Sequence, residues 1–173
     1  MRNIIKDRQI VADDWNVLKL EEGQAPESVA VGAGKVLVPL KVWQAQRDSL
    51  ASRNDVGVWI DSDERAEALK EDAAKLPVIA VNFPKFADGR GYSIAYNLRM
   101  RLKYTGELRA IGDVLRDQLF YMQRVGFNAF AVREDKDIND ALKSLKDFTE
   151  PYQNSVDLKA PLFRRVQRNG VTA

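Results

Sequence analysis

The sequence predicts an α/β fold, in which repeated βα units build a mostly parallel sheet behind a small N-terminal β region. Four short apolar runs alternate with stretches in which apolar residues recur at helical spacing. Parallel strands need a long crossover between them, and a helix usually supplies it. The pattern is compatible with an open sheet, but the even spacing favours one that curves like part of a (β/α) barrel. The runs read VGVWI, PVIAVNF, ELRAIG and NAFAV.

The composition predicts one domain. The chain has 173 residues, of which 45% are hydrophobic and 30% charged, an ordinary balance for a single core. We expect a β region with a loop over residues 1–35, a βα core over residues 36–148 and a C-terminal tail over residues 149–173. The net charge of +2 gives no overall field for nucleic acid or an acidic membrane, so neither is expected as a partner. No signal-like or membrane-spanning run is visible, which predicts a cytoplasmic protein.

The chain contains neither cysteine nor histidine. This excludes a thiolate nucleophile, a Ser–His pair, a disulfide framework, a cysteine-held iron–sulfur cluster, a histidine-held haem and the usual zinc sites. Unaided chemistry would need carboxylates, Lys, Arg, Tyr or an oxygen-ligated cation. The sequence predicts no metal ligands and does not identify a cofactor. We expect the purified protein to be colourless.

The first third of the chain begins with a β hairpin. Apolar residues flank Lys6, Asp7 and Arg8 in NIIKDRQIV, which is typical of a hairpin turn. Residues 21–34 are expected to be loop, and VGAGK within that region precedes a strand, unlike a phosphate-binding loop. KVLVPL predicts a strand that ends at Pro39, and a weakly amphipathic helix is expected over residues 43–53.

Each later strand is followed by a predicted helix. The Asp61 and Glu64 pair is typical of a helix start, because each side chain can satisfy free backbone donors there. A second helix follows the glycine loop, a third is expected to open at Asp113, and a fourth lies behind NAFAV. The apolar positions that define the four helices are Ala66, Leu69, Ala73 and Leu76; Ile94, Leu98 and Leu102; Leu115, Leu119 and Met122; and Ile138, Leu142 and Leu145. Large aromatic residues are expected in the core, namely Trp15, Trp43, Trp59, Phe120 and Tyr121.

The loop FPKFADGRG, at the end of the second run, is the strongest candidate for a site. Glycine permits close approach or positive φ, and free N–H groups at a helix start together with Arg90 suit an anion. The alternative is a tight strand-to-helix turn, in which Asp88 caps the helix and Arg90 pairs locally. The glycine spacing matches neither a phosphate loop nor a dinucleotide fingerprint.

Charged residues gather at the expected carboxyl ends of the strands. Arg109 stands inside ELRAIG, and a buried guanidinium needs a carboxylate or a ligand, so it either joins the Arg90 site or pairs structurally with Asp88 or Asp113. Asp113, Arg116 and Asp117 would share one helix face, as part of the same rim or as a solvated face. The candidate residues for binding an anion or a partner are Lys85, Asp88, Gly89, Arg90, Gly91, Arg109, Asp113, Arg116 and Asp117.

Two segments carry a family resemblance. FPKFADGRGYSIAYNLR and YTGELRAIGDVLRDQLFYMQRVGFNAF resemble the bacterial family called domain of unknown function nine-three-four, with looser likeness at DDW, VLVPL and PYQ. Members of that family are described as oxidoreductases involved in sulfite reduction and look like companions of assimilatory sulfite reductase. The resemblance implies a place in sulfur assimilation, and the six charged candidates from Asp88 to Asp117 carry over because they stand in these segments.

The residues and the resemblance together leave several functions open. The leading hypothesis is an accessory protein of sulfite reduction, whose rim holds a small oxyanion or an acidic surface of sulfite reductase or of its electron donor. Whether the chain is itself an enzyme is left open. The alternatives are an oxidoreductase with an unrecognised bound cofactor, a carboxylate enzyme using a divalent cation on Asp61, Asp88 and Asp113, and a pure scaffold for the reductase.

Overall fold

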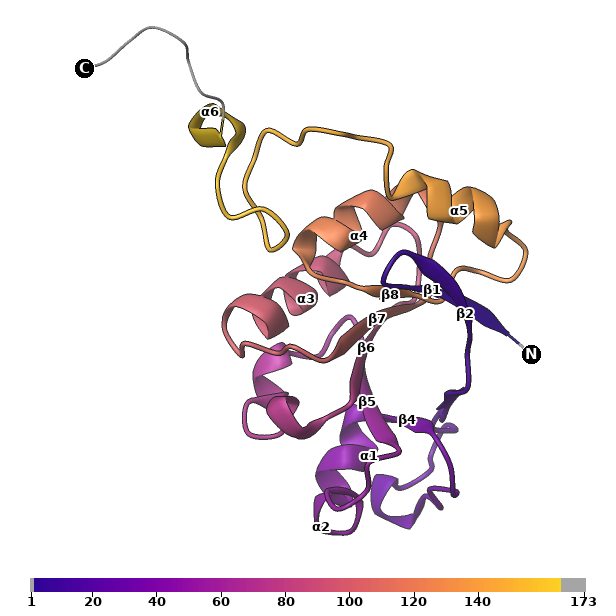
Figure 1. The fold of residues 1–173 in the computed structure, drawn as a ribbon. Helices are drawn as coiled ribbons and strands as arrows, with labels where there is room; N and C mark the ends of the chain where they lie inside the picture. Colours follow the sequence, from indigo (N-terminus) through magenta and orange to yellow (C-terminus); the bar gives the residue numbers. More distant parts are fainter. Residues whose placement is uncertain (1, 166–173) are drawn as a thin grey trace, which may run out of the picture.

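A computed structural model, which describes residues 2–165, contains one mixed sheet of eight strands in the order β2-β1-β8-β7-β6-β5-β4-β3. The strands from β3 to β8 pair in parallel, whereas β1 pairs antiparallel with β2 and β8. The α/β class and the mostly parallel sheet are therefore confirmed, and the sheet curls into a half-barrel (Figure 1). The strands are β1 (Asn3–Lys6), β2 (Gln9–Ala12), β3 (Asn16–Val17), β4 (Val36–Pro39), β5 (Val56–Ile60), β6 (Val78–Phe83), β7 (Glu107–Gly112) and β8 (Ala129–Phe130).

Most helices are short and cover the outer face of the sheet, where α3 lies against β6 and against α4 (Figure 1). The helices are α1 (Leu40–Ala45), α2 (Arg47–Leu50), α3 (Arg90–Met100), α4 (Leu119–Val125), α5 (Ile138–Ser144) and α6 (Leu162–Arg165), with 3-10 turns η1 (Pro26–Ser28), η2 (Ala66–Leu69), η3 (Ala73–Lys75) and η4 (Arg116–Gln118). Within residues 2–165, no helix is both long and apolar enough to cross a membrane.

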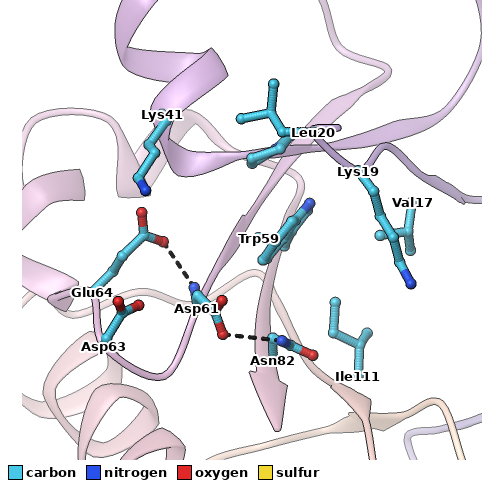
Figure 2. A pocket seen from close by; sticks show the side chains of 11 residues that line it. Val17, Lys19, Leu20, Lys41, Trp59, Asp61, Asp63, Glu64, Asn82 and Ile111 are labelled. Atoms are coloured by element: carbon cyan, nitrogen blue, oxygen red, sulfur yellow. Dashed lines mark hydrogen bonds between the residues drawn. The ribbon is translucent and has the colours of Figure 1, made fainter. Parts of the chain in front are cut away.

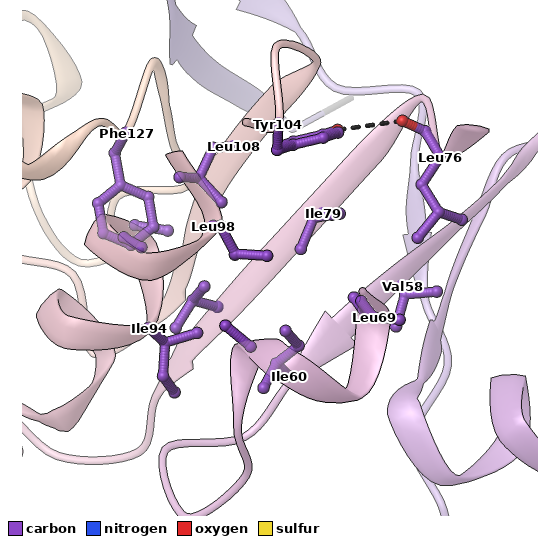
Figure 3. Packing of buried hydrophobic residues seen from close by; sticks show 14 of the residues in the cluster. Val58, Ile60, Leu69, Leu76, Ile79, Ile94, Leu98, Tyr104, Leu108 and Phe127 are labelled. Atoms are coloured by element: carbon purple, nitrogen blue, oxygen red, sulfur yellow. Dashed lines mark hydrogen bonds between the residues drawn. The ribbon is translucent and has the colours of Figure 1, made fainter. Parts of the chain in front are cut away.

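The outer face of the sheet carries the main core. Because side chains alternate along a strand, every second residue of β5, β6 and β7 points toward the helices. These side chains meet Ile94 and Leu98 of α3 and Leu69 of η2 in one cluster (Figure 3). The strand residues of this layer are Val56, Val58 and Ile60; Ile79, Val81 and Phe83; and Leu108 and Ala110.

The intervening residues fill the inside of the half-barrel. They form a second, smaller apolar cluster, against which Val11, Trp15, Val17 and Trp59 pack while half-buried. The buried members of this inner cluster are Ile4, Leu37, Val78, Ala80, Ile111 and Ala131. Both faces of the central strands are thus covered, which explains why these strands read as nearly continuous apolar runs.

The two edges of the sheet are joined by a very short connection. Edge strand β2 ends at Ala12 and the opposite edge strand β3 begins at Asn16, so residues 13–15 link them. A chain of this length spans at most ~14 Å, which forces the two edges toward each other. Figure 1 shows the chain after β2 running along the open side of the sheet toward β4. We call residues 13–15 the strap.

A buried ion cluster ties the strap to the centre of the sheet. Arg109 of β7 donates from Nη1 to Asp13 Oδ1 at 2.7 Å and from Nε to Glu107 Oε1 at 2.7 Å. Lys6 Nζ lies 2.7 Å from the other oxygen of Glu107. The Arg109 side chain is only 2% exposed. The sequence correctly required a carboxylate partner for Arg109, but the partners are Asp13 and Glu107 and neither Asp88 nor Asp113.

The N-terminal hairpin is confirmed, and its strand β1 extends the main sheet by pairing with β8. Asp7 and Arg8 both have positive φ, as a two-residue hairpin turn requires. The helix expected over residues 43–53 is instead the pair α1 and α2. The break falls at Gln46, whose side-chain amide donates to the carbonyls of Pro26 and Val29.

Two predicted helices are wrong over part of their length. Residues 66–76 form only η2 and η3, because Asp72 is drawn inward to accept hydrogen bonds from Trp43 Nε1 and Arg47. The third helix does not open at Asp113: Gly112 turns the chain at φ +92°, and regular structure starts with η4 at Arg116. Tertiary hydrogen bonds override local periodicity at Asp72, and the glycine turn at Gly112 does so before Asp113.

Replacing Arg109 should test the ion cluster. Arg109→Ala would leave Asp13 and Glu107 buried without their partner, and we expect it to lower the free energy of unfolding by ~3–5 kcal/mol. Urea unfolding measures this loss. The matched control is Arg101→Ala, which removes an exposed pair with Glu67 and should cost less than ~1 kcal/mol. Equal stability of the two variants would contradict a structural role for the cluster.

Candidate functional site

The DGRG loop forms a local network at the start of α3. Arg90 donates to Asp88 from Nε at 2.9 Å and from Nη2 at 2.7 Å, and its backbone N–H donates to the same carboxylate at 3.2 Å. Ser62 Oγ donates to Asp88 Oδ2 at 2.7 Å and accepts from Arg90 Nη2 at 2.9 Å. Arg90, and then Ser62, hold the pKa of Asp88 well below its usual range. We call Ser62, Asp88 and Arg90 the brace.

The two glycines of this loop have different roles, and neither has positive φ. A Cβ on Gly91 would lie 2.7 Å from the Phe83 ring, so Gly91 permits close packing of α3 on the end of β6. A Cβ on Gly89, the residue before α3, would meet only Tyr92, at an ordinary 3.6 Å. Close helix–strand packing therefore accounts for one glycine of the pair.

The remaining candidate residues engage separate partners. Asp113 accepts from the Phe86 backbone N–H and from Arg133, both at 2.8 Å. Arg116 pairs with Asp140 of α5 and with Asp147 of the segment that follows α5, which ties η4 to both. Asp117 and Lys85 are exposed. Asp113, Arg116 and Asp117 do not share a helix face, because Asp113 precedes η4.

The structure does not bring Arg90 and Arg109 onto common partners. Arg90 lies at the carboxyl edge on the brace, whereas Arg109 points into the half-barrel toward Asp13 and Glu107. The carboxylates of the cation hypothesis are likewise separate: Asp88 pairs with Arg90, Asp113 with Arg133, and Asp61 with Asn82. Within residues 2–165, no group of three acidic side chains is arranged to hold a metal ion.

A cavity of about 380 Å³ opens at the carboxyl ends of the strands, inside the half-barrel (Figure 2). This is the edge at which ligands bind in barrel-like and open α/β sheets. The chain beyond the strap supplies one wall together with Pro39 of β4 and Lys41 of α1, and β5, β6, β7 and the turn after β5 supply the other. The lining residues are Val17, Lys19, Leu20, Pro39, Lys41, Trp59, Asp61, Asp63, Glu64, Asn82 and Ile111.

Sheet register sets the level of the polar groups in this cavity. Asn82 is the register partner of Ile111, and Asp61 follows Ile60, the partner of Val81, so the three lie in one row. Asn82 Nδ2 donates to Asp61 Oδ1 at 3.0 Å. Trp59 and Arg109 both pair in register with Ala80, one row deeper in the half-barrel. The ion cluster thus lies immediately beneath the cavity.

Glu64 has an altered ionisation equilibrium. Its carboxylate accepts a hydrogen bond from the Asp61 backbone N–H at 2.8 Å. This is one of the two hydrogen bonds that the Asp61 and Glu64 pair was expected to form at a helix start. Burial raises the pKa of Glu64, and the charges of Asp63 and Asp61 add to that rise, whereas the Asp61 N–H and Lys41 oppose it. Lys41 points toward Glu64 across the cavity mouth (Figure 2).

The brace and the cavity share one turn. Ser62 belongs to the brace, while its neighbours Asp61, Asp63 and Glu64 line the cavity. The Ser62 backbone N–H donates to Asp61 Oδ1 at 2.8 Å. Asp88 and Arg90 therefore act as positioning residues for the acidic turn at residues 61–64.

The sequence interpretation missed most of the cavity. Trp59 was expected in the core but is half-buried and lines the cavity, and Tyr121 is exposed, whereas Trp43 is buried as expected. One usable signal was Asn82, a polar side chain at the inward-facing end of a buried strand. Lys19 and Lys41 gave no signal, because their approach depends on the curvature of the sheet.

Comparison with known proteins gives one match. The family described as "Bacterial protein of unknown function (DUF934)" matches residues 57–163, more than half of the chain. The chain belongs to this family. No curated protein and no solved structure matches it significantly. In this DUF934 protein the matched region contains the brace and the cavity residues from Trp59 to Ile111, whereas the wall from Val17 to Lys41 precedes it.

Gly91→Ala should test the packing that places the loop. Its added methyl group would press on Phe83, which cannot retreat easily because it packs against Tyr92 and Phe127. We expect a loss of about 1–2 kcal/mol in the free energy of unfolding. Gly89→Ala is the matched control and should change stability by less than ~1 kcal/mol. A larger loss for Gly89→Ala would contradict this assignment.

Glu64→Gln should change how stability depends on pH. Because the pKa of Glu64 is raised in the fold, the folded state binds the proton more tightly, and stability falls as pH rises through the range just above the ordinary glutamate pKa. The variant lacks this loss, so its stability relative to the wild-type protein should improve between about pH 4 and about pH 7. Urea unfolding across this range measures the difference, with the exposed Glu134→Gln as control. Identical pH profiles for Glu64→Gln and wild type would refute the raised pKa.

Proposed function

We propose that this DUF934 protein is a cytoplasmic accessory protein of assimilatory sulfite reduction, which docks sulfite reductase or its electron donor at the carboxyl edge of its half-barrel. The pathway rests on the resemblance of the central segments to a family whose members are described as acting in sulfite reduction, because the matching family model itself is of unknown function. The edge supplies the surface, because Lys85, Phe86 and Arg90 are exposed there.

The observation that carries docking at this edge is Phe86. Its side chain is 52% exposed, although its backbone is fixed on both sides. Its N–H donates to Asp113, and its carbonyl accepts from Gln118 Nε2 at 3.4 Å. An exposed aromatic residue on a fixed loop loses little entropy on binding, and aromatic and arginine side chains are enriched among the residues that dominate interfaces. The neighbouring Lys85 is exposed, and the Arg90 side chain is 60% exposed despite its pair with Asp88, so both can contact an acidic partner surface.

This proposal favours the acidic surface of a partner over a small oxyanion as the ligand of the DGRG loop. Arg109 is already engaged by two carboxylates, and Arg90 by one, so an incoming oxyanion would have to displace Asp88 from Arg90. A partner's acidic surface can instead contact the outer face of Arg90, whose side chain is 60% exposed. A small oxyanion remains a candidate ligand of the loop only through that displacement.

A second candidate function is a carboxylate enzyme. It is favoured by Glu64, whose raised pKa and position in the cavity suit a general acid, with the Asp61 carboxyl group in the same lining. In this case Glu64→Gln would abolish turnover of a bound ligand and leave its affinity nearly unchanged. The oxidoreductase alternative requires an electron carrier, and the visible spectrum of the purified protein tests it directly.

Gene deletion and affinity capture test the accessory role. In the bacterium that encodes this protein, deletion should prevent growth on sulfate or sulfite and leave growth on cysteine intact. The tagged protein should capture sulfite reductase or its electron donor. Phe86→Ser should lose this capture, because it removes the fixed apolar contact. Met100→Ser is the matched control, since Met100 is 41% exposed at the other end of α3. Normal growth of the deletion strain on sulfite would refute the proposal.

A further inference from the structure

The cavity inside the half-barrel has a rigid aromatic wall. Trp59 Nε1 donates to the Leu18 carbonyl at 2.8 Å, which fixes the plane of the indole ring. Leu20 and Ile111 line the cavity near that ring (Figure 2). A fixed indole face between aliphatic side chains suits a flat aromatic ligand. Aromatic rings stack favourably in an offset arrangement, and an indole that is already fixed loses little conformational entropy when a ligand stacks on it.

The polar side of the cavity offers hydrogen-bond acceptors. Asn82 Nδ2 donates a hydrogen bond to Asp61 Oδ1, which also accepts one from the Ser62 backbone N–H. Within the described part of the chain, neither Asp61 Oδ2 nor Asn82 Oδ1 accepts a hydrogen bond, and neither is a buried unsatisfied atom. A ligand that reaches these two oxygens must therefore donate hydrogen bonds.

The charges of the lining disfavour an anion. The lining carries three carboxylates, Asp61, Asp63 and Glu64, and two ammonium groups, Lys19 and Lys41. Lys41 is directed at Glu64, so one of the two cations is already opposed by a carboxylate (Figure 2). Sulfite, sulfate or phosphate would meet net repulsion here, whereas a neutral or weakly cationic ring with N–H donors would not.

The size of the cavity limits the ligand further. Small-molecule sites commonly enclose about 300–1,000 Å³. At about 380 Å³ this cavity lies near the lower limit. That volume suits one fused ring system with a small substituent and is too small to enclose a dinucleotide.

From these four features we propose that the cavity binds an amino-substituted planar nitrogen heterocycle of nucleobase size. The ring stacks on Trp59, and its N–H groups donate to Asp61 Oδ2 and Asn82 Oδ1. Carboxylate and amide oxygens are the groups that accept from the exocyclic amines of bases elsewhere. This site goes beyond partner docking, because it needs only this chain and uses none of Lys85, Phe86 or Arg90.

Calorimetric titration of the full chain tests the site with adenosine, guanosine and cytidine as probes. We expect at least one of them to bind, and its N,N-dimethyl derivative, which lacks the exocyclic donors, to bind at least about 10-fold more weakly. Sulfite, phosphate and butylamine should give no comparable binding. The N,N-dimethyl comparison alters only the ligand, so it remains decisive even where a protein variant fails to fold.

Protein variants then locate the ligand. Trp59→Leu keeps an apolar side chain but removes the ring face, and Asp61→Asn removes the charged acceptor. Each should weaken binding about 10-fold. Tyr121→Leu is the matched control, because Tyr121 is an exposed aromatic residue of α4 that does not line the cavity, and the affinity of this variant should match wild type. Thermal unfolding verifies that each variant is folded.

Three results would overturn the proposal: no binding of any nucleoside at millimolar concentration, equal binding of the N,N-dimethyl derivatives, or unchanged affinity in folded Trp59→Leu and Asp61→Asn. These results are separable from the accessory role. Heterocycle binding with normal growth of the deletion strain would refute only the role in sulfite reduction. A growth defect with partner capture but without heterocycle binding would refute only this site.

Discussion

The half-barrel depends on the ion pair between Arg109 and Asp13. A curved sheet of eight strands with free edges would expose its inner face, but the strap crosses that opening and Arg109 anchors it to β7. Glu107 satisfies the rest of the guanidinium, so the charges are buried with their partners and not alone. The same anchor directs the following residues, including Lys19 and Leu20, along the carboxyl edge, where they form a wall of the cavity. A contact that looks purely structural therefore also shapes the cavity at the carboxyl edge.

At the carboxyl edge, the residues that hold the site differ from those that line it. Asp88 and Arg90 are conspicuous in the sequence, yet they face Ser62 and fix the turn behind it. Asp61 and Glu64, on the same turn, face the cavity. Gly91 has a comparable role, because it lets α3 pack directly on Phe83 and so sets the distance between the loop and the turn. Glycine and charge in a loop can thus indicate a cavity that they support without lining it.

Local patterns predicted the strands well and the site poorly. VGVWI and PVIAVNF identified β5 and β6, because burial on both faces leaves an unbroken apolar signal. The segment after Asp61 could not be predicted in this way, since Asp72 accepts hydrogen bonds from Trp43 and Arg47, residues more than twenty positions earlier. The partner of Arg109 lies 96 positions away, and only the closure of the sheet brings Asp13 to it. The lysines of the cavity were hidden for the same reason: their place depends on curvature, which no local pattern encodes.

The turn at residues 61–64 lies between the surface around Phe86 and the cavity. A change in the contacts of one surface can therefore reach the other through this turn. On one side Ser62 accepts from Arg90, next to the exposed Phe86; on the other side Asp61 holds Asn82 at the cavity wall. A partner that drew Arg90 away from Asp88 would leave Ser62 with one contact fewer and would loosen the backbone N–H that now fixes Asp61 Oδ1. Conversely, a ligand that ordered Asp61 would favour the arrangement in which Arg90 stays on the brace. Coupling between two sites is reciprocal, so a partner that binds the outer face without breaking the brace and a ligand in the cavity would stabilise the same conformation of this turn.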